Sequence, residues 1–282
     1  MYFILNFFIW VRKNGIRLLL GQYPNKLLIS SNNSYKNKEF QNNLVTSSDN
    51  LWVSKYMHEK WESYSAKNEI TLSIFSNKDV NEYMYENFKN DLIYEIYKKS
   101  MIPVQKIDIF RICFIYLSGG IWLDFKSEVN LDKVISLYKN SNNQGLLLSE
   151  QRSIELITNS NNKNQKIFGN VIHNGFFFLP KGSIFLKNLI QIIERDFLYF
   201  QDIEFSNPKQ GIMNLTGPHQ FTRTYHLLNK KNRPLLAKHI DVDWQYFSRF
   251  GEYLSPFRIK KHYSDLKNLK TIDSIRETYL SE

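Results

Sequence analysis

One short stretch, residues 103–124, constrains the fold of this chain more than any other. Its first part begins at Pro103 and has apolar residues at helical spacing, namely Ile107, Phe110, Phe114 and Leu117. Gly119 and Gly120 end this predicted helix, and residues 121–124 follow as a buried strand that finishes on Asp124. A helix, a tight glycine turn and a buried strand in direct succession are typical of α/β proteins.

The same alternation extends along the chain. Further strands are expected at residues 26–29, 69–75, 145–149 and 176–179, and helices between 80 and 100 and after the turn at 180–183. The Asn-rich segments 30–43 and 153–165 are expected to be loops. No linker or repeat divides the chain, so we predict a single domain over residues 23–282 with a mixed or mostly parallel sheet.

Composition excludes several classes of protein. The chain has 282 residues, of which 43% are hydrophobic, so it is neither disordered nor a coiled-coil rod. A single cysteine, Cys113, excludes a disulfide scaffold and a Cys-rich zinc module. The net charge of +10 points to an anionic partner: phosphates, nucleic acid, an anionic membrane or an acidic polymer.

The first 22 residues are expected to form an N-terminal helix. Residues 2–10 are nearly all apolar, but this run has about half of the ~20 residues that a spanning helix needs. A signal peptide would carry its charges before the apolar run, whereas Arg12, Lys13 and Arg17 come after it. The helix would pack on the domain or lie on an anionic membrane surface. We therefore expect a cytoplasmic protein, free or peripheral on the inner membrane face.

The chemistry suggested by the central stretch depends on three charged residues. Asp108 and Arg111 are three apart on the predicted helix, so they share a face. Asp124 follows at the carboxyl end of the buried strand, which is where open α/β sheets bind ligands. Glycines at Gly119 and Gly120 allow a close approach of backbone to ligand. The set suits a site for a sugar and a charged phosphate group.

These residues resemble the core of glycosyltransferase family 32 and its relatives. The family pattern is a helix with Asp-x-x-Arg, then Gly-Gly, then a strand that ends in Asp-x-Asp, matched here by Asp108, Arg111, Gly119, Gly120 and Asp124. Weaker matches flank it in family order: the segment from Trp61 to Val80, Asn174-Gly175-Phe176 and Thr216-Gly217-Pro218. The resemblance covers roughly residues 25–225.

The resemblance implies a GT-A fold, with a Rossmann-like mixed sheet flanked by helices, and transfer of a sugar with retention of configuration. It implies a nucleotide-diphosphate sugar donor (UDP- or GDP-sugar), a glycan or lipid-linked acceptor, and a Mn²⁺ or Mg²⁺ ion. Asp124 and Arg111 become the expected catalytic residues. The expected nucleotide-sugar site comprises Asp108, Arg111, Gly119, Gly120, Asp124, Lys126 and Asn174.

The chain departs from the family at the second acid of Asp-x-Asp, where Lys126 stands. Lys126 could bring an ammonium to the diphosphate and replace part of the charge of the metal. Alternatively Glu128, which shares a strand face with Asp124, could help Asp124 to hold the metal with waters and phosphate oxygens.

Two functions therefore compete. The first is a retaining glycosyltransferase in surface polysaccharide biosynthesis. The alternative is a catalytically degenerate basic module that binds an anionic glycan, a membrane or nucleic acid. The intact acids, arginine and glycine pair favour the enzyme. Lysines and arginines are dispersed and form no binding motif, so no nucleic-acid partner is expected. The surplus charge, with Arg258, Lys260, Lys261 and His262 near the C-terminus, would hold anionic lipid or an acidic glycan.

Overall fold

The computed structural model describes residues 26–28, 43–47, 52–68, 70–124, 127–141, 144–160, 163–246 and 266–273. The expected N-terminal helix of residues 1–22, Lys126 and residues 258–262 lie outside these ranges. None of the helices within them is long and apolar enough to cross a membrane.

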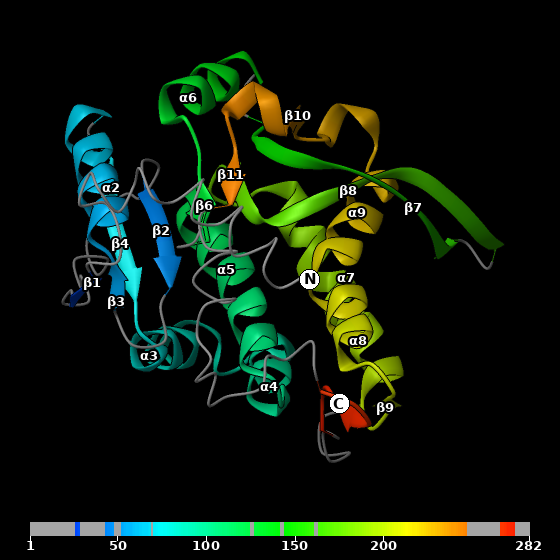
Figure 1. The fold of residues 1–282 in the computed structure, drawn as a ribbon. Coiled ribbons are helices and arrows are strands. Elements are labelled where there is room, and N and C mark those ends of the chain that lie inside the picture. Colours follow the sequence, from blue (N-terminus) through cyan, green and yellow to red (C-terminus); the bar gives the residue numbers. More distant parts are fainter. Residues whose placement is uncertain are drawn as a thin grey trace, which may run out of the picture.

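A six-stranded mixed sheet forms the centre of the molecule (Figure 1). Its strands, in spatial order, are β10 (Leu235–Lys238), β7 (Leu146–Ser160), β8 (Lys163–Leu179), β5 (Gly120–Leu123), β2 (Asn43–Ser47) and β4 (Thr71–Phe75). β5, β2 and β4 run parallel to one another, and β10 runs parallel to β7. β8 is antiparallel to both of its neighbours, which makes the sheet mixed, as predicted.

Three two-stranded pairs lie outside this sheet. They are β1 (Lys26–Leu28) with β3 (Trp52–Ser54), β6 (Ser127–Glu128) with β11 (Gln245–Tyr246), and β9 (Glu204–Phe205) with β12 (Leu269–Lys270). In the second pair, β6 begins directly after Lys126 in the sequence and contains Glu128, the other expected metal ligand.

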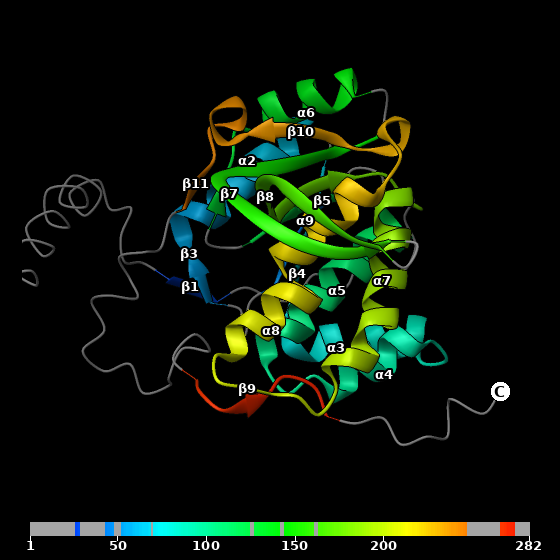
Figure 2. The same cartoon turned by 90° about the vertical axis from the view of Figure 1, so that its right-hand side faces the viewer.

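Helices cover both faces of the sheet (Figure 2). On one face lie α3 (Asn77–Phe88), α4 (Leu92–Lys99), α5 (Pro103–Ser118), α7 (Ile184–Phe200) and α9 (Pro218–Leu227), and on the other α2 (Lys55–Asn68) and α6 (Leu131–Asn140). The remaining helices are α8 (Pro208–Leu215) and two 3-10 turns, η2 (Lys230–Asn232) and η3 (His239–Val242). β5 shows the two cores clearly, because Trp122 enters one and its neighbours Ile121 and Leu123 enter the other.

The helix α5 has the bounds that the sequence predicts. Pro103 occupies its first turn, where a missing N–H costs nothing. It ends at Gly119, whose N–H donates to the Ile115 carbonyl at 2.8 Å and whose φ of 71° favours glycine. The start of α3 differs from the prediction: α3 begins at Asn77 and not near Val80, because Ser76 and Asp79 form a capping box.

The prediction of a loop at residues 153–165 is wrong. β7 and β8 continue as a long antiparallel arm that extends away from the rest of the sheet (Figure 1). The described side chains at its outer end are mostly exposed, including Phe168. Few described side chains of the arm are buried, Leu156 being one, so its strands need little apolar alternation and the sequence reads as a polar loop. The short strand β2, whose Leu44 and Val45 are buried beside β5, was also missed.

Candidate functional site

A buried ion pair on α5 is the starting point of the site. The Nη2 atom of Arg111 lies 3.0 Å from Oδ1 of Asp108, as expected for residues three apart on one helix. Both residues are buried, which separates this pair from an ordinary surface pair. Buried charges of this kind are retained only where each of them is paired and hydrogen-bonded.

Asp124 joins this pair from the end of β5. Its Oδ1 atom lies 3.1 Å from Nη1 of Arg111 and accepts a hydrogen bond from Nε1 of Trp122 at 2.9 Å. The guanidinium of Arg111 also stacks over the Trp122 ring, 5.0 Å from its centroid. The Asp124 side chain is 32% exposed, whereas that of Arg111 is 5% exposed. Asp124 is therefore the member of the cluster that faces outward.

Asn174 reaches the pair from a bulge in β8. Leu147 of β7 pairs with Phe177, but the next residue, Leu148, pairs with His173, so three residues of β8 are extra. The bulge directs the Asn174 carbonyl to Nη1 of Arg111 at 2.7 Å, and the Asn174 carboxamide donates to Oδ1 of Asp108 at 3.0 Å.

Thr216 completes the shell around Asp108 and was not among the expected site residues. Its hydroxyl donates to Oδ2 of Asp108 at 3.2 Å, and the side chain is fully buried where α8 ends. The sequence offered one indication, the order of the Thr216-Gly217-Pro218 segment in the resemblance, but that segment reads equally well as a turn.

Burial dominates the electrostatics of the cluster. It raises the pKa of Asp108 to about 7, against the lowering effects of Arg111, Thr216 and Asn174. Burial also lowers the pKa of His173 to about 4, although Asp124 raises it. His173 is therefore neutral at physiological pH.

The structure does not bring every expected residue into this cluster. Gly119 and Gly120 lie at the opposite end of β5 from Asp124, where Gly120 pairs with Leu179. The requirement for glycine at 119 comes from its turn, because a Cβ atom there would lie 2.7 Å from the backbone nitrogen of Lys181. Lys126 is outside the described residues.

Glu128 lies in β6, opposite Gln245 of β11. Within the described ranges, no group of three or more His, Cys, Asp or Glu side chains could hold a metal ion. All hydrogen bonds and ion pairs that described residues make with the Asp124 carboxylate fall on Oδ1. The oxygen Oδ2 has no hydrogen-bond or ion-pair partner among the described residues, and it belongs to a side chain that is 32% exposed.

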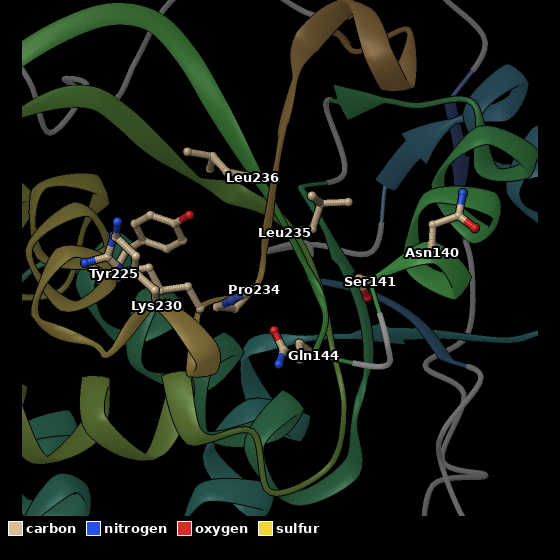
Figure 3. A pocket seen from close by; sticks show the side chains of 9 residues that line it. Asn140, Ser141, Gln144, Tyr225, Lys230, Pro234, Leu235 and Leu236 are labelled. Atoms are coloured by element: carbon tan, nitrogen blue, oxygen red, sulfur yellow. The ribbon is translucent and has the colours of Figure 1, made fainter.

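A separate hollow of about 390 Å³ lies beside β10, the strand at one edge of the sheet (Figure 3). Leu235 lies in its wall, with Tyr225 and Lys230 on one side in this view and Asn140 on the other. The Leu235 N–H bonds the carbonyl of Gly145, which precedes β7, so this hollow is at the amino end of that strand. It shares no residue with the Asp124 cluster.

Comparisons with known proteins give distant likenesses. No protein-family model matches the chain and no curated protein matches it, so membership of glycosyltransferase family 32 stays a prediction. The PaToxG glycosyltransferase is similar at 12% identity and a TM-score of 0.42, over 66% of this chain and 69% of that one. The UDP-bound glycosyltransferase domain of the YGT toxin is similar at 11% identity and a TM-score of 0.36, over 68% of this chain and 57% of that one. The function therefore has to be inferred from the residues of this chain.

Proposed function

We propose that this chain is a retaining GT-A-type glycosyltransferase. It would move a sugar from a UDP- or GDP-sugar to a glycan or lipid-linked acceptor, in surface polysaccharide biosynthesis. The observation that carries the proposal is Asp124: a partly exposed carboxylate at the carboxyl end of β5, with one oxygen held by Arg111 and Trp122.

The proposed role of Asp124 is to orient the donor. Its Oδ1 atom is fixed by two donors, so the carboxylate plane cannot rotate freely, and Oδ2 can accept a hydrogen bond from a hydroxyl of the ribose or the donor sugar. A preorganised acceptor of this kind loses little entropy when the substrate binds.

Arg111 acts through Asp124 in this proposal and does not grip the donor itself. Its guanidinium already contacts Asp108, Asp124 and the Asn174 carbonyl, and its side chain is almost fully buried. Asp108 holds the guanidinium in place, since Asn174 and Thr216 in turn fix both oxygens of Asp108. The expected catalytic role of Arg111 becomes one of positioning.

Negative charge grows on the leaving diphosphate during transfer, and a nearby cation would stabilise it. One candidate is Lys126, two residues beyond Asp124. The second candidate is Mn²⁺ or Mg²⁺, held by Asp124 and Glu128 together with waters and phosphate oxygens. The oxygen Oδ2 of Asp124 fits such an ion, because no described residue bonds it. A bound ion would supply positive charge at the diphosphate.

We also propose where the surplus positive charge acts. Nucleotide sugars are available in the cytoplasm, so the enzyme would work there, free or on the inner membrane face. The basic residues of segments 1–22 and 258–261 would hold anionic lipid or an acidic glycan acceptor.

The test is a screen of UDP- and GDP-sugars for binding and slow hydrolysis by the full chain, with Mn²⁺ and with a chelator. We expect one donor to be hydrolysed, and Asp124→Ala to abolish this. The matched control is Asp132→Ala, which removes an exposed acid on α6 that pairs with Lys67. No response to any donor, or full turnover by Asp124→Ala, would overturn the proposal. Turnover in chelator would favour Lys126 over a metal.

A further inference from the structure

The bulge in β8 decides where Asn174 lies, and the structure shows what fixes the shape of the bulge. His173 is the last residue before it and Gly175 is its middle residue. The Gly175 N–H donates to Nδ1 of His173 at 3.1 Å. The Gly175 carbonyl accepts the Asp124 N–H at 2.8 Å. Both peptide groups that flank the Gly175 Cα atom are therefore bonded, one to His173 and one to Asp124.

The imidazole, the glycine and the carboxylate are in close contact. A Cβ atom on Gly175 would lie 2.5 Å from Cε1 of His173 and 2.6 Å from Oδ2 of Asp124. The His173 ring also packs edge-on against Trp244, with 4.9 Å between the ring centroids. Trp244 follows η3. Val242 of η3 is fully buried, and its carbonyl accepts the Asn130 N–H at 2.8 Å. The His173 ring thus packs against a residue whose segment is itself anchored by the bond from Asn130.

We propose that His173 is a positioning residue of the site, an inference that rests on the proposed transferase function. Its Nδ1 atom closes the bulge by accepting the Gly175 N–H, and the closed bulge delivers the two groups of Asn174 to Arg111 and Asp108. Without this acceptor, an N–H beside the site loses its partner and the bulge can relax toward regular pairing. Asn174 then withdraws, and the guanidinium that orients Asp124 loses a contact.

Three substitutions separate this role from general packing. His173→Asn keeps a carbonyl oxygen at the same number of bonds from Cα as Nδ1, and such an oxygen accepts the N–H two residues on, as in an Asx turn. His173→Gln places its amide one bond further out, and His173→Leu fills similar space with no acceptor. We therefore expect only the Asn variant to keep the hydrogen bond from the Gly175 N–H.

Two measurements are made on each variant that keeps the wild-type melting curve. The first is hydrogen exchange of the Gly175 amide, followed by NMR. We expect protection in wild type and His173→Asn, and exchange about tenfold faster in the Leu and Gln variants, the size of one hydrogen bond. The second is donor hydrolysis, where we expect kcat in the Asn variant to exceed that of the Leu variant by about tenfold.

The exchange measurement does not depend on the proposed function, whereas the hydrolysis measurement does. Unchanged Gly175 exchange in the Leu variant would overturn the closure by His173, whatever the activity. Equal kcat in folded Asn and Leu variants would overturn the positioning role. If wild type turns over no donor, the transferase proposal fails. The exchange data then still decide whether His173 closes the bulge.

Discussion

The buried carboxyl of Asp108 makes the stability of this protein depend on pH in a direction that can be measured. Burial raises its pKa from the usual 3.8 to about 7. Between these values the folded state binds a proton that the unfolded state has lost, so the free energy of unfolding falls as the pH rises. The contribution of protonated Asp108 to the free energy of unfolding is complete below pH 3.8 and is lost by the time the pH passes 7.

The magnitude follows from the size of the shift. A difference of about three pKa units corresponds to about 4 kcal/mol in total, of which about 3 kcal/mol falls between pH 5 and pH 8. Asp108→Asn removes the titration while keeping an oxygen and the shape of the side chain. The other titrating groups remain in both proteins, so the effects of those that do not interact with Asp108 cancel in the difference between wild type and variant.

The assay is urea unfolding of wild type and Asp108→Asn at pH 5, 6, 7 and 8, followed by circular dichroism. We expect the stability of wild type relative to the variant to fall by about 3 kcal/mol over this range. A constant difference would refute the reasoning, because it would mean that Asp108 does not change its charge there. A difference that grows with pH would show that the ion pair with Arg111 outweighs burial.

Two further substitutions test the geometry around Asp124 and Asp108. Gly175→Ala places a methyl group 2.6 Å from Oδ2 of Asp124 and 2.5 Å from Cε1 of His173, so we expect donor hydrolysis to fall by at least about tenfold and the melting temperature to fall as well. Unchanged hydrolysis would contradict the close contact. Thr216→Val removes the hydroxyl that donates to Oδ2 of Asp108, and we expect urea unfolding to show a loss of about 1–3 kcal/mol. A loss no larger than that of a Thr71→Val control, at a half-buried threonine of β4 outside the cluster, would argue against this bond.

Local sequence patterns predicted the part of the site that local geometry builds. Helical spacing placed Asp108 and Arg111 on one face, and the end of a buried strand placed Asp124 at the edge of the sheet. The same reasoning, followed along β5, puts Gly119 and Gly120 at its other end. Although β5 has only four residues, the glycines and Asp124 lie at its opposite ends. The sequence motif, read alone, does not show that they are separated in this way.

The rest of the site depends on distant segments that no local pattern connects. Thr216 lies 108 residues from Asp108 in the chain, and only the packing of α8 brings its hydroxyl to the carboxylate. The bulge that directs Asn174 is a mismatch between β7 and β8, so it exists only once both strands are paired. For the same reason nothing in the sequence distinguishes His173 from the other five of its six histidines.

The buried ion pair is itself an argument for function. Moving Asp108 and Arg111 out of water is costly, and well-packed apolar side chains at both positions would stabilise such a core at least as well. Four separate elements nonetheless supply groups to this pair: α5, β5, β8 and the end of α8. The atom that gains from this arrangement is Oδ1 of Asp124, because the guanidinium that bonds it cannot turn away without breaking its bonds to Asp108 and Asn174. A network that costs stability and fixes one partly exposed carboxylate is what the proposed substrate-orienting role of Asp124 requires.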